Sequence, residues 1–518
     1  MWGELARREH FLRASGSADW PDGTVAARYE FRHALYQEVL YHRLTARRQQ
    51  RLHQRIGERE EQAYGDRARE IATELAVHFK RGREFRKAIQ YLQQAGENAI
   101  RRSANHEAIS LLTKGLELLK TLPDTPEHTQ QELTLQITLG ALLGMTQGFA
   151  APEVEKAYVR ARELCQQVEV TPQLFPILAG LCGFYLLRAE LQTARELAEQ
   201  LLTLAQRLQA PALLVRAHYL LGITLFWLGE LAPALEHLEQ GVALYDPQQR
   251  HFYRAGPDPK VVCLVHALHV LWLLGYPNQA LQRSHAALTV AQALSHPFSL
   301  ATALGNAAAL HRLRREVQAV QERAEAAMTL STEQGFAVLL ANGTVLRGWV
   351  LAEQGQMEEG LAQIWQGLAA LRTTGTEVHR PNFLALLAEA YEKAGQVEAG
   401  LNVLAEALAL VDKTGERYYE AELYRLKGQL TLQSKVPGPK SKVEKEAEEC
   451  FLKAIEIARQ QQAKSLELRA VMSLSRLWQQ QGKKKQARQM LAEIYGWFTE
   501  GFDTKDLQEA KALLEELA

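Results

Sequence analysis

The stretch LLGITLFWLGELAPALEHL, residues 220–238, decides the fold. Its apolar residues recur at helical spacing on both sides of Gly229, and no alternation typical of a strand interrupts them. Because glycine readily adopts the positive φ that ends a helix, this break predicts two helices joined by a tight turn. Gly222 and Ala234 are expected where the helices cross, since larger side chains there would force them apart at a cost of about 1–3 kcal/mol.

The same helix pair recurs along the chain. A Leu-Gly step in the first helix, a glycine at the turn and a small residue in the second helix together resemble a tetratricopeptide repeat. The small residue returns about every 40 residues, at Ala88, Ala157, Ala194, Ala234, Ala280, Ala319, Gly360, Gly400, Ala447 and Ala487. The predicted fold class is therefore all-α, a right-handed α-α superhelix of about ten tetratricopeptide-like helix pairs.

Domain boundaries follow from where the period holds. We expect a repeat solenoid over residues 63–502 and a capping helix over residues 503–518. Two longer intervals indicate insertions. The first, residues 246–259, is rich in proline and is expected to form a loop over one rim of the inner groove. The second, residues 434–444, is expected to be a basic linker.

Residues 1–62 do not follow the repeat period. The sequence WPDG at residues 20–23 predicts a turn, and the short stretch at residues 27–31 is strand-like. A helix is expected to begin near Phe31. This order of elements is typical of the end of a winged helix, so we expect a small winged-helix remnant and a connecting helix here.

The segments FRHALYQEV, residues 31–39, and RLHQRI, residues 51–56, resemble a particular family. They are similar to the link between the ATPase module and the repeats in bacterial signal-transduction ATPases with numerous domains. Some members of that family are fused to a class III adenylate or guanylate cyclase. The resemblance implies that this chain corresponds to the C-terminal, winged-helix-end and repeat part of such a protein. Neither a G-x-x-x-x-G-K-[ST] loop nor the paired aspartates of a cyclase is present, so no enzyme activity is expected. His33 is expected to serve at a helix start.

Composition excludes several other classes of function. The chain has 60 basic and 60 acidic residues, which argues against a strongly basic nucleic-acid binder. No apolar run approaches the roughly 20 residues of a membrane helix, and no secretory signal is visible, so a cytoplasmic location without membrane association is expected. His266 and His269 lie three apart without a third ligand, and we therefore expect neither a metal nor a cofactor.

The inner surface of the superhelix is the predicted binding site. Stacked pairs leave a concave groove lined by the first helix of each repeat. Aromatic and arginine side chains on that face are the types that anchor partners. Since a shift of one position turns a side chain by about 100°, some of the chosen residues would instead belong to the core. The predicted groove residues are Tyr219, Phe226, Trp227, His269, Trp272, His311, Arg312, Trp349 and Glu389.

Three functions remain open at this point. The first is a non-catalytic sensor or scaffold module that binds a protein, a peptide or a small effector in the groove. The second is a C-terminal fragment of an adenylate or guanylate cyclase or an ATPase whose catalytic domains lie upstream. The third is a stand-alone scaffold subunit of a multi-protein complex, with oligomerisation through its end repeats.

Overall fold

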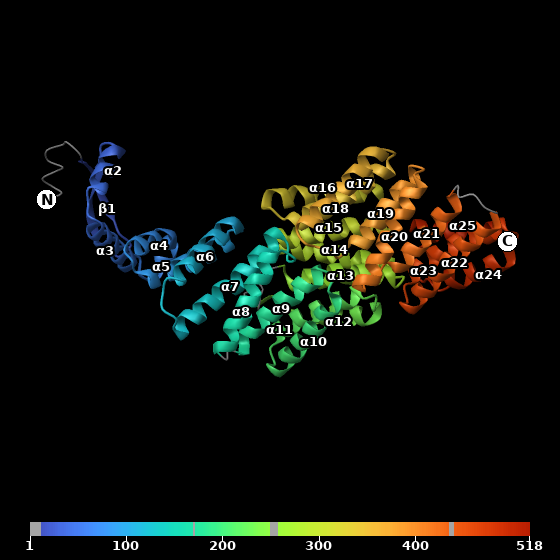
Figure 1. Ribbon diagram of the computed structural model, residues 1–518, viewed down its shortest axis with the longest axis horizontal. Helices are drawn as coiled ribbons and strands as arrows, with labels where there is room; N and C mark the ends of the chain where they lie inside the picture. The colour runs from blue at the N-terminus through green and yellow to red at the C-terminus, as the bar shows by residue number, and fades with distance from the viewer. Residues whose placement is uncertain (1–11, 169–170, 249–256, 435–439) are drawn as a thin grey trace. The chain divides into compact units, whose positions relative to one another are not determined.

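The computed structural model describes residues 12–168, 171–248, 257–434 and 440–518, and these residues are mostly helical (Figure 1). The predicted fold class, an α-α superhelix of tetratricopeptide-like helix pairs, is confirmed. The chain forms two compact units, Met1–Leu139 and Gly140–Ala518, which are described separately below. The predicted boundaries at residues 62 and 502 stay predictions.

A two-stranded hairpin opens the first unit. Strands β1 (Leu12–Asp19) and β2 (Val25–Phe31) pair antiparallel, which confirms the predicted turn and strand. Helix α2 (Ala34–His42) follows, and the backbone N–H of Leu35 donates to His33 Nδ1 over 3.1 Å. His33 therefore caps a helix start, as expected. The winged-helix remnant stays a prediction, because residues 1–11 lie outside the described part of the chain.

Helices build the rest of the first unit. Phe79 is buried where these helices pack: its ring stacks on Tyr91 with centroids 5.5 Å apart, and a Cβ on Gly57 would lie 3.2 Å from it, in tight contact. Ala88 is fully buried at the predicted close approach. The elements are α3 (Ala46–Tyr64), the 3-10 helix η1 (Gly65–Ile71), α4 (Ala72–Arg81), α5 (Phe85–Arg101), α6 (Asn105–Leu119) and α7 (Pro126–Gln147), whose last turns belong to the second unit.

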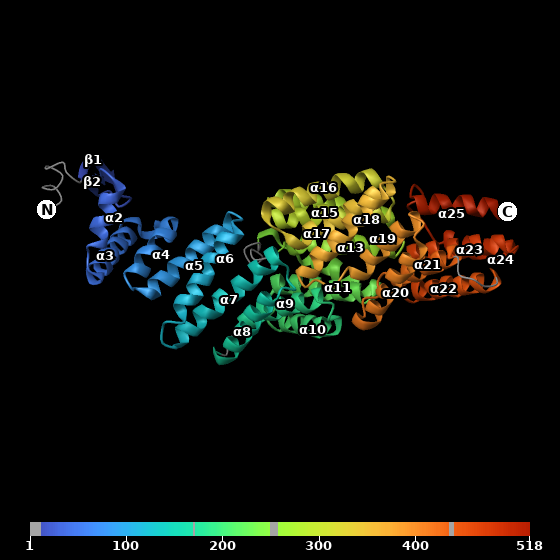
Figure 2. The same cartoon turned by 45° about the horizontal axis from the view of Figure 1, so that its top comes forward.

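The second unit is a series of antiparallel helix pairs between α8 (Pro152–Val168) and α25 (Lys505–Glu516). Successive pairs lie side by side in two views (Figures 1 and 2). The pairs are α9 (Thr171–Leu187) with α10 (Leu191–Arg207), α11 (Pro211–Trp227) with α12 (Leu231–Leu244), α13 (Pro259–Leu273) with α14 (Pro277–Leu294), α15 (Pro297–Leu313) with α16 (Val317–Gln334), α17 (Ala337–Glu353) with α18 (Met357–Thr373), α19 (Arg380–Lys393) with α20 (Val397–Thr414), α21 (Glu420–Gln433) with α22 (Lys440–Gln460), and α23 (Lys464–Gln480) with α24 (Lys484–Tyr495).

Tight turns join the two helices in seven of these pairs, and five of the seven contain the expected glycine; the connection between α21 and α22 falls mostly outside the described residues. A positive φ occurs at Gly229, Gly275, Gly355, Gly395 and Gly482. Two pairs make the same turn without glycine, because Ala189 and Arg315 adopt the left-handed conformation at φ values of 57° and 63°. These two turns carry no glycine signal in the sequence.

Small residues let the paired helices approach closely, as predicted. A Cβ on Gly222 would lie 2.8 Å from Leu238 Cγ and 3.2 Å from the Ala234 carbonyl oxygen. Gly348 and Gly360 face one another, and a Cβ on either would lie 2.8 Å from the backbone oxygen of the other. Side chains at these positions would meet backbone atoms that cannot move aside.

One predicted contact position between paired helices is wrong by one residue. Ala319 is only half-buried, whereas the next residue, Val320, is fully buried in α16. The buried position lies four residues after the Arg315–Glu316 turn, just as Ala234 lies four residues after Glu230. A valine therefore occupies the contact position in this pair, and the search for a small residue selected its neighbour.

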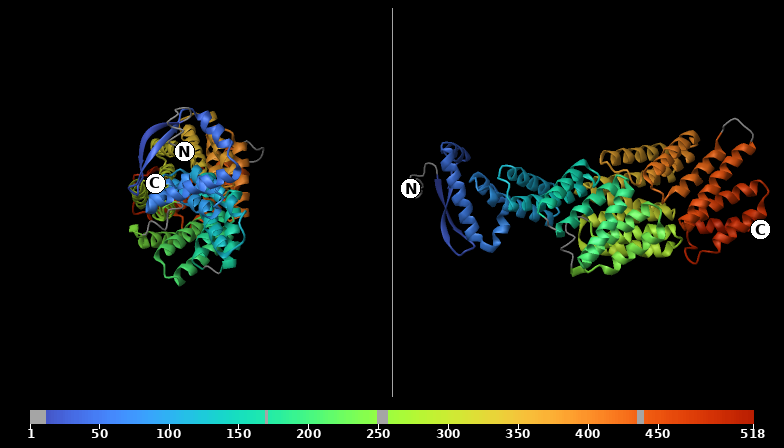
Figure 3. Two further views of the ribbon diagram at one scale, coloured as in Figure 1. Left: turned by 90° about the vertical axis from the view of Figure 1, so that its left-hand side faces the viewer. Right: turned by 60° about the horizontal axis from the view of Figure 1, so that its bottom comes forward.

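A seam closes the inner surface of the second unit. The end of a first helix lies against the start of a first helix five pairs later in three of its contacts and four pairs later in the fourth. The carbonyl oxygens of Leu187, Trp227, Trp272 and Leu313 accept hydrogen bonds, in that order, from the Glu377 N–H (2.8 Å), the Arg417 N–H (2.8 Å), the Ser465 hydroxyl (2.5 Å) and the Arg469 guanidinium (2.8 Å). Helices α13 and α23 also touch directly. We call these four contacts the seam. Figure 3 shows the ribbon in two further views, coloured by residue number.

Candidate functional site

Three neighbouring cavities lie inside the second unit, among the inner helices. An apolar cavity of about 210 Å3 adjoins a middle cavity of about 90 Å3, and a charged cavity of about 220 Å3 follows. The walls shared by the apolar and middle cavities include Trp227, His266, Asn306, Asn342 and His379, while Arg312 belongs to both the middle and the charged cavity. The inner surface of the second unit is thus divided into three adjoining, partly open cavities where one continuous open groove was expected.

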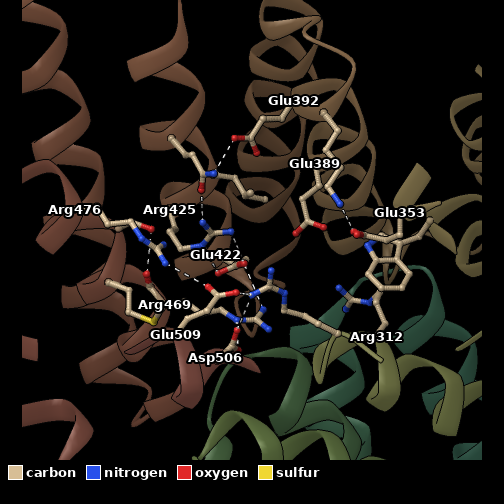
Figure 4. Close-up of a pocket in the computed structure, with 17 residues that line it drawn as sticks. Arg312, Glu353, Glu389, Glu392, Glu422, Arg425, Arg469, Arg476, Asp506 and Glu509 are labelled. Atoms are coloured by element: carbon tan, nitrogen blue, oxygen red, sulfur yellow. Dashed lines mark hydrogen bonds and ion pairs between the residues drawn. The ribbon is translucent and has the colours of Figure 1, made fainter. Parts of the chain in front are cut away.

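The charged cavity is built from successive first helices and α25, each of which contributes a charged or aromatic side chain (Figure 4). Two ion pairs in its wall have short nitrogen–oxygen distances and are partly shielded from water. Arg425 donates two hydrogen bonds of 2.8 and 2.9 Å to the carboxylate of Glu422, and Arg469 donates one of 2.7 Å to Asp506. The charged members of the wall are Arg312, Arg315, Lys393, Arg425, Arg469 and Arg476, with Glu353, Glu389, Glu392, Glu422, Asp506 and Glu509.

Arg312 and Glu389 form no salt bridge with any described residue. Glu392 in the same wall forms none either, but it accepts hydrogen bonds from the side-chain amides of Gln429 and Gln433. Arg312 is buried; its Nη1 lies 3.4 Å from the Tyr419 hydroxyl, and its Nε has no partner in the described chain. Burial raises the pKa of Glu389, although Arg312 opposes that shift. The charged cavity therefore keeps one positive and one acidic group available to a ligand.

Neutral histidines and aromatic rings surround the middle cavity. Burial lowers the pKa of His266 to about 4 and the pKa values of His269 and His379 to about 3. All three imidazoles are therefore uncharged near neutral pH. His269 Nε2 lies 2.9 Å from the side-chain oxygen of Asn306, and the Trp227 ring meets His379 edge-on at 4.4 Å. Across the described ranges, no three histidine, cysteine or acidic residues gather as a metal site.

Seven of the nine predicted groove residues line one or more of these cavities. Tyr219 and Trp227 border the apolar cavity, Phe226, Trp227, His269 and Arg312 border the middle cavity, and Arg312, Trp349 and Glu389 border the charged cavity. Two lie elsewhere. The Trp272 ring packs 4.8 Å from the Arg469 guanidinium at the seam, and His311 Nδ1 pairs with Glu316 Oε2 at 2.5 Å.

The expectation of an open groove needs correction. Most of the predicted side chains are buried rather than presented on an exposed concave face, because the seam packs one turn of the superhelix onto the next. The buried ones are Tyr219, Phe226, Trp227, Trp272, Arg312 and Trp349, whereas His269, His311 and Glu389 are half-buried. Their role in binding a partner stays a prediction.

The two insertions fall partly outside the described chain. Residues 249–256 and 435–439 are not described, so the expected loop over one rim and the expected basic linker stay predictions. Pro257, at the end of the first insertion, does line the apolar cavity.

Sequence reasoning missed several cavity residues. Arg216 is one of them, although it is the only acidic, lysine or arginine residue in the apolar stretch PALLVRAHYLLGITLFW of α11, which was an available signal. His379 and Tyr418 were also missed. Both lie in connections between pairs, and they reach the middle cavity only through the seam. No local pattern marks them.

Comparison with known proteins gives one curated relative and a broad structural likeness. No family model matches the chain. An uncharacterized protein of Rhizobium meliloti (strain 1021) is 25% identical over 455 residues, which cover 87% of this chain and 43% of that protein. The chain thus spans less than half the length of this relative.

Solved structures of several helical-repeat proteins are similar at low identity. They include a Rap protein complexed with competence and sporulation factor (TM-score 0.43, 12% identity, 70% of this chain and 99% of that one). Yeast Tom70 matches with a TM-score of 0.33 and 12% identity, over 87% of this chain and 96% of that one. Aspartyl phosphate phosphatase F from Bacillus subtilis matches with a TM-score of 0.37 and 12% identity, over 72% of this chain and 94% of that one.

A membrane-spanning helix is not found in the described ranges, since none there combines sufficient length with sufficient apolar character.

Proposed function

We propose that the chain is a non-catalytic sensor or scaffold module that binds a peptide segment of a partner protein, or a small effector, in the cavities of its second unit. The observation that carries this proposal is the pair Arg312 and Glu389, two cavity-lining charges without a salt bridge among the described residues. Leaving buried charges uncompensated is unfavourable, so a ligand that pairs with both would gain affinity. A peptide with one acidic and one basic group fits this requirement.

The net charge of the charged cavity also suits such a ligand. Its wall contains six cationic and six acidic side chains, so neither a strongly acidic nor a strongly basic partner is favoured. Trp349 and Met472 supply apolar surface between these charges, and aromatic surface of this kind commonly anchors bound peptides.

A test begins with capture of partners on the tagged chain, followed by synthesis of the captured segment and calorimetric titration. Glu389→Gln keeps the shape of the side chain and removes its charge, so we expect affinity for the segment to fall about tenfold or more. Glu359→Gln, on the exposed face of α18, serves as the matched control. Equal affinity of wild type and Glu389→Gln would contradict the proposal.

A second candidate is favoured by the length of the relative. Because the Rhizobium meliloti protein extends well beyond the matched region, we also propose that this module works within a longer protein, such as a signal-transduction ATPase or an adenylate or guanylate cyclase. The genomic sequence upstream of Met1 tests this directly. An in-frame phosphate-binding loop or cyclase domain would support it, and a stop codon close to Met1 would contradict it.

A cytoplasmic location is part of the proposal. Cys182, Cys263 and Cys450 are free thiols, which suits a reducing compartment. Fractionation of the source cells would test the location, and recovery of the chain from an oxidising compartment would contradict it.

A further inference from the structure

The apolar cavity contains a positive charge that no acidic group balances. Arg216 on α11 lines this cavity, where its neighbours include the rings of Phe149, Tyr158, Phe298 and Phe336. The guanidinium makes no salt bridge with a described residue, and its Nε is buried without a hydrogen-bond partner there. Arginine stays protonated in proteins, so this charge cannot be relieved by loss of a proton.

The groups that face the guanidinium are neutral. They are the phenols of Tyr158 and Tyr219 and the Cys182 thiol. Burial raises the pKa values of Tyr158 and Cys182 to about 12 and also raises that of Tyr219. None of these groups is an anion near neutral pH, so the charge of Arg216 remains uncompensated.

A second buried polar atom in the same wall also lacks a partner. The Trp227 side chain is only 2% exposed, and its indole Nε1–H donates to no described group. Buried donors of this kind are normally satisfied. Arg216 and Trp227 belong to the same helix and both line the apolar cavity, so two polar side chains are built into its otherwise largely apolar wall.

A glycine keeps part of this cavity open. Gly183 lies in the interior of α9, where glycine is a poor helix former, yet a Cβ built on it would meet nothing within 4 Å. Gly144 and Gly180 differ, because a Cβ on either would collide with the ring of Phe149 or Tyr158 at 2.2 Å. Packing therefore explains Gly144 and Gly180 but not Gly183.

We propose that the apolar cavity binds a small organic acid with an apolar body, whose carboxylate pairs with Arg216. The volume of about 210 Å3 suits a molecule of about ten non-hydrogen atoms, since an engineered cavity of about 150 Å3 holds benzene. A guanidinium matches a carboxylate through two parallel hydrogen bonds. This inference deepens the proposed function by naming the ligand class of one cavity.

Calorimetric titration with 3-phenylpropionate tests the ligand class, and 3-phenylpropionamide is the neutral control of the same shape. We expect saturable binding of the acid at least about tenfold tighter than binding of the amide, because only the acid compensates the guanidinium. Quenching of tryptophan fluorescence gives a second readout, as Trp227 lies in the wall. Equal affinity for acid and amide, or no saturable binding of the acid at millimolar concentration, would overturn the proposal.

Two variants assign the site. Arg216→Met should bind the acid at least about tenfold more weakly, while its melting temperature without ligand stays at or above that of the wild type, because an uncompensated charge has been removed. Gly183→Leu should block the acid by filling the cavity, whereas Gly183→Ala should bind it normally. Undiminished binding of the acid in Gly183→Leu would overturn the assignment even if Arg216→Met failed to fold.

The outcome is separable from that of the proposed function. If the acid does not bind but a captured peptide is lost in Glu389→Gln, only the present inference fails. If the acid binds through Arg216 and no peptide or effector depends on Glu389, the peptide site in the charged cavity fails instead.

Discussion

Gly348 and Gly305 lie on inner helices of the same unit and serve opposite purposes. A Cβ on Gly348 would lie 2.8 Å from the Gly360 oxygen and from the Ile364 nitrogen, both of which are backbone atoms. A Cβ on Gly305 would meet nothing within 4 Å. The first glycine is needed for close packing of α17 and α18, and the second leaves space at the middle cavity.

Alanine substitution should therefore change stability in opposite directions at these two sites. Gly348→Ala is expected to destabilise by about 1–3 kcal/mol through overpacking. Gly305→Ala is expected to stabilise by about 0.5–1 kcal/mol, because alanine favours the helix and meets no obstacle. Urea unfolding of the two variants beside the wild type measures both effects. Destabilisation of similar size in both would show that the two glycines are equivalent.

Glu416 gives the second unit a dependence on pH. Burial raises the pKa of its carboxyl from 4.5 to about 8. The backbone N–H of His379 donates a hydrogen bond of 3.2 Å to its Oε1, and its Oε2 has no partner in the described chain. Since the folded pKa lies above the unfolded one, the protonated acid is favoured by folding. The stability that the protonated Glu416 carboxyl contributes to the folded state is fully present below about pH 4.5. It is lost as the pH rises towards 8.

Glu416→Gln should remove this loss. The amide keeps a side-chain oxygen for His379 but cannot ionise, so the variant should become more stable than the wild type as the pH rises from about 5 to about 9. Thermal melts across this range test the expectation. A constant difference in melting temperature would mean that Glu416 does not titrate with folding.

At the scale of single residues, the sequence predicted only some of the positions that matter for packing and for the cavities. The turn glycines and Gly222 were predicted because glycine has a distinct conformational role. Val320 and Arg216 were not, because a valine at a contact position and a lone arginine in an apolar helix have meaning only once the neighbouring helices are known.

At the scale of elements, the terminal helix α25 closes the array with an apolar face. Leu507, Leu513 and Leu517 are buried in a cluster with Ile494 and Phe498. The sequence predicted a capping helix over residues 503–518, and α25 lies within that range. The helix pairs were equally predictable, since each depends on a local period. The pairs joined at Ala189 and Arg315 were harder to delimit because their turns contain no glycine.

Leu513→Ala should therefore loosen the C-terminal end. Removing a buried leucine side chain is expected to destabilise this cluster by about 2–5 kcal/mol. Hydrogen exchange measured by mass spectrometry should become faster in α23, α24 and α25. Glu515→Ala, an exposed change in the same helix, provides the control and should leave exchange unaltered. Unchanged exchange in Leu513→Ala would contradict the packing described for α25.

At the scale of the whole second unit, the seam determines how the repeats behave. A simple solenoid has contacts only between neighbouring repeats. Here, hydrogen bonds join residues far apart in sequence, such as Trp227 with Arg417 and Trp272 with Ser465. No repeat period encodes such contacts, which is why the division into separate cavities was not predicted although seven of the nine predicted groove residues line them.

Arg469 is the side chain on which the seam depends most. It donates to Asp506 over 2.7 Å and to the Leu313 oxygen over 2.8 Å, and it lies over the Trp272 ring. Arg469→Met should leave Asp506 without this partly buried partner and destabilise by about 3–5 kcal/mol. Hydrogen exchange should rise in α13 and α23 together, although they are far apart in sequence.

Arg476→Met is the matched control for that prediction. Arg476 is exposed, lies two helical turns further along α23, and pairs with Glu509 at 3.3 Å. We expect its replacement to change stability by less than about 1 kcal/mol. Faster exchange confined to α23 in Arg469→Met would indicate that the two turns are not coupled.

The seam also restricts how this protein can change in length. Open repeat arrays tolerate duplication or loss of a unit, because each unit sees only its neighbours. In this chain, adding a helix pair between α15 and α20 would shift Arg417, Ser465 and Arg469 out of reach of their acceptors, the carbonyl oxygens of Trp227, Trp272 and Leu313. Growth of the array is therefore expected only at its ends, and the number of pairs per turn is as much a fixed property of the fold as its turn glycines.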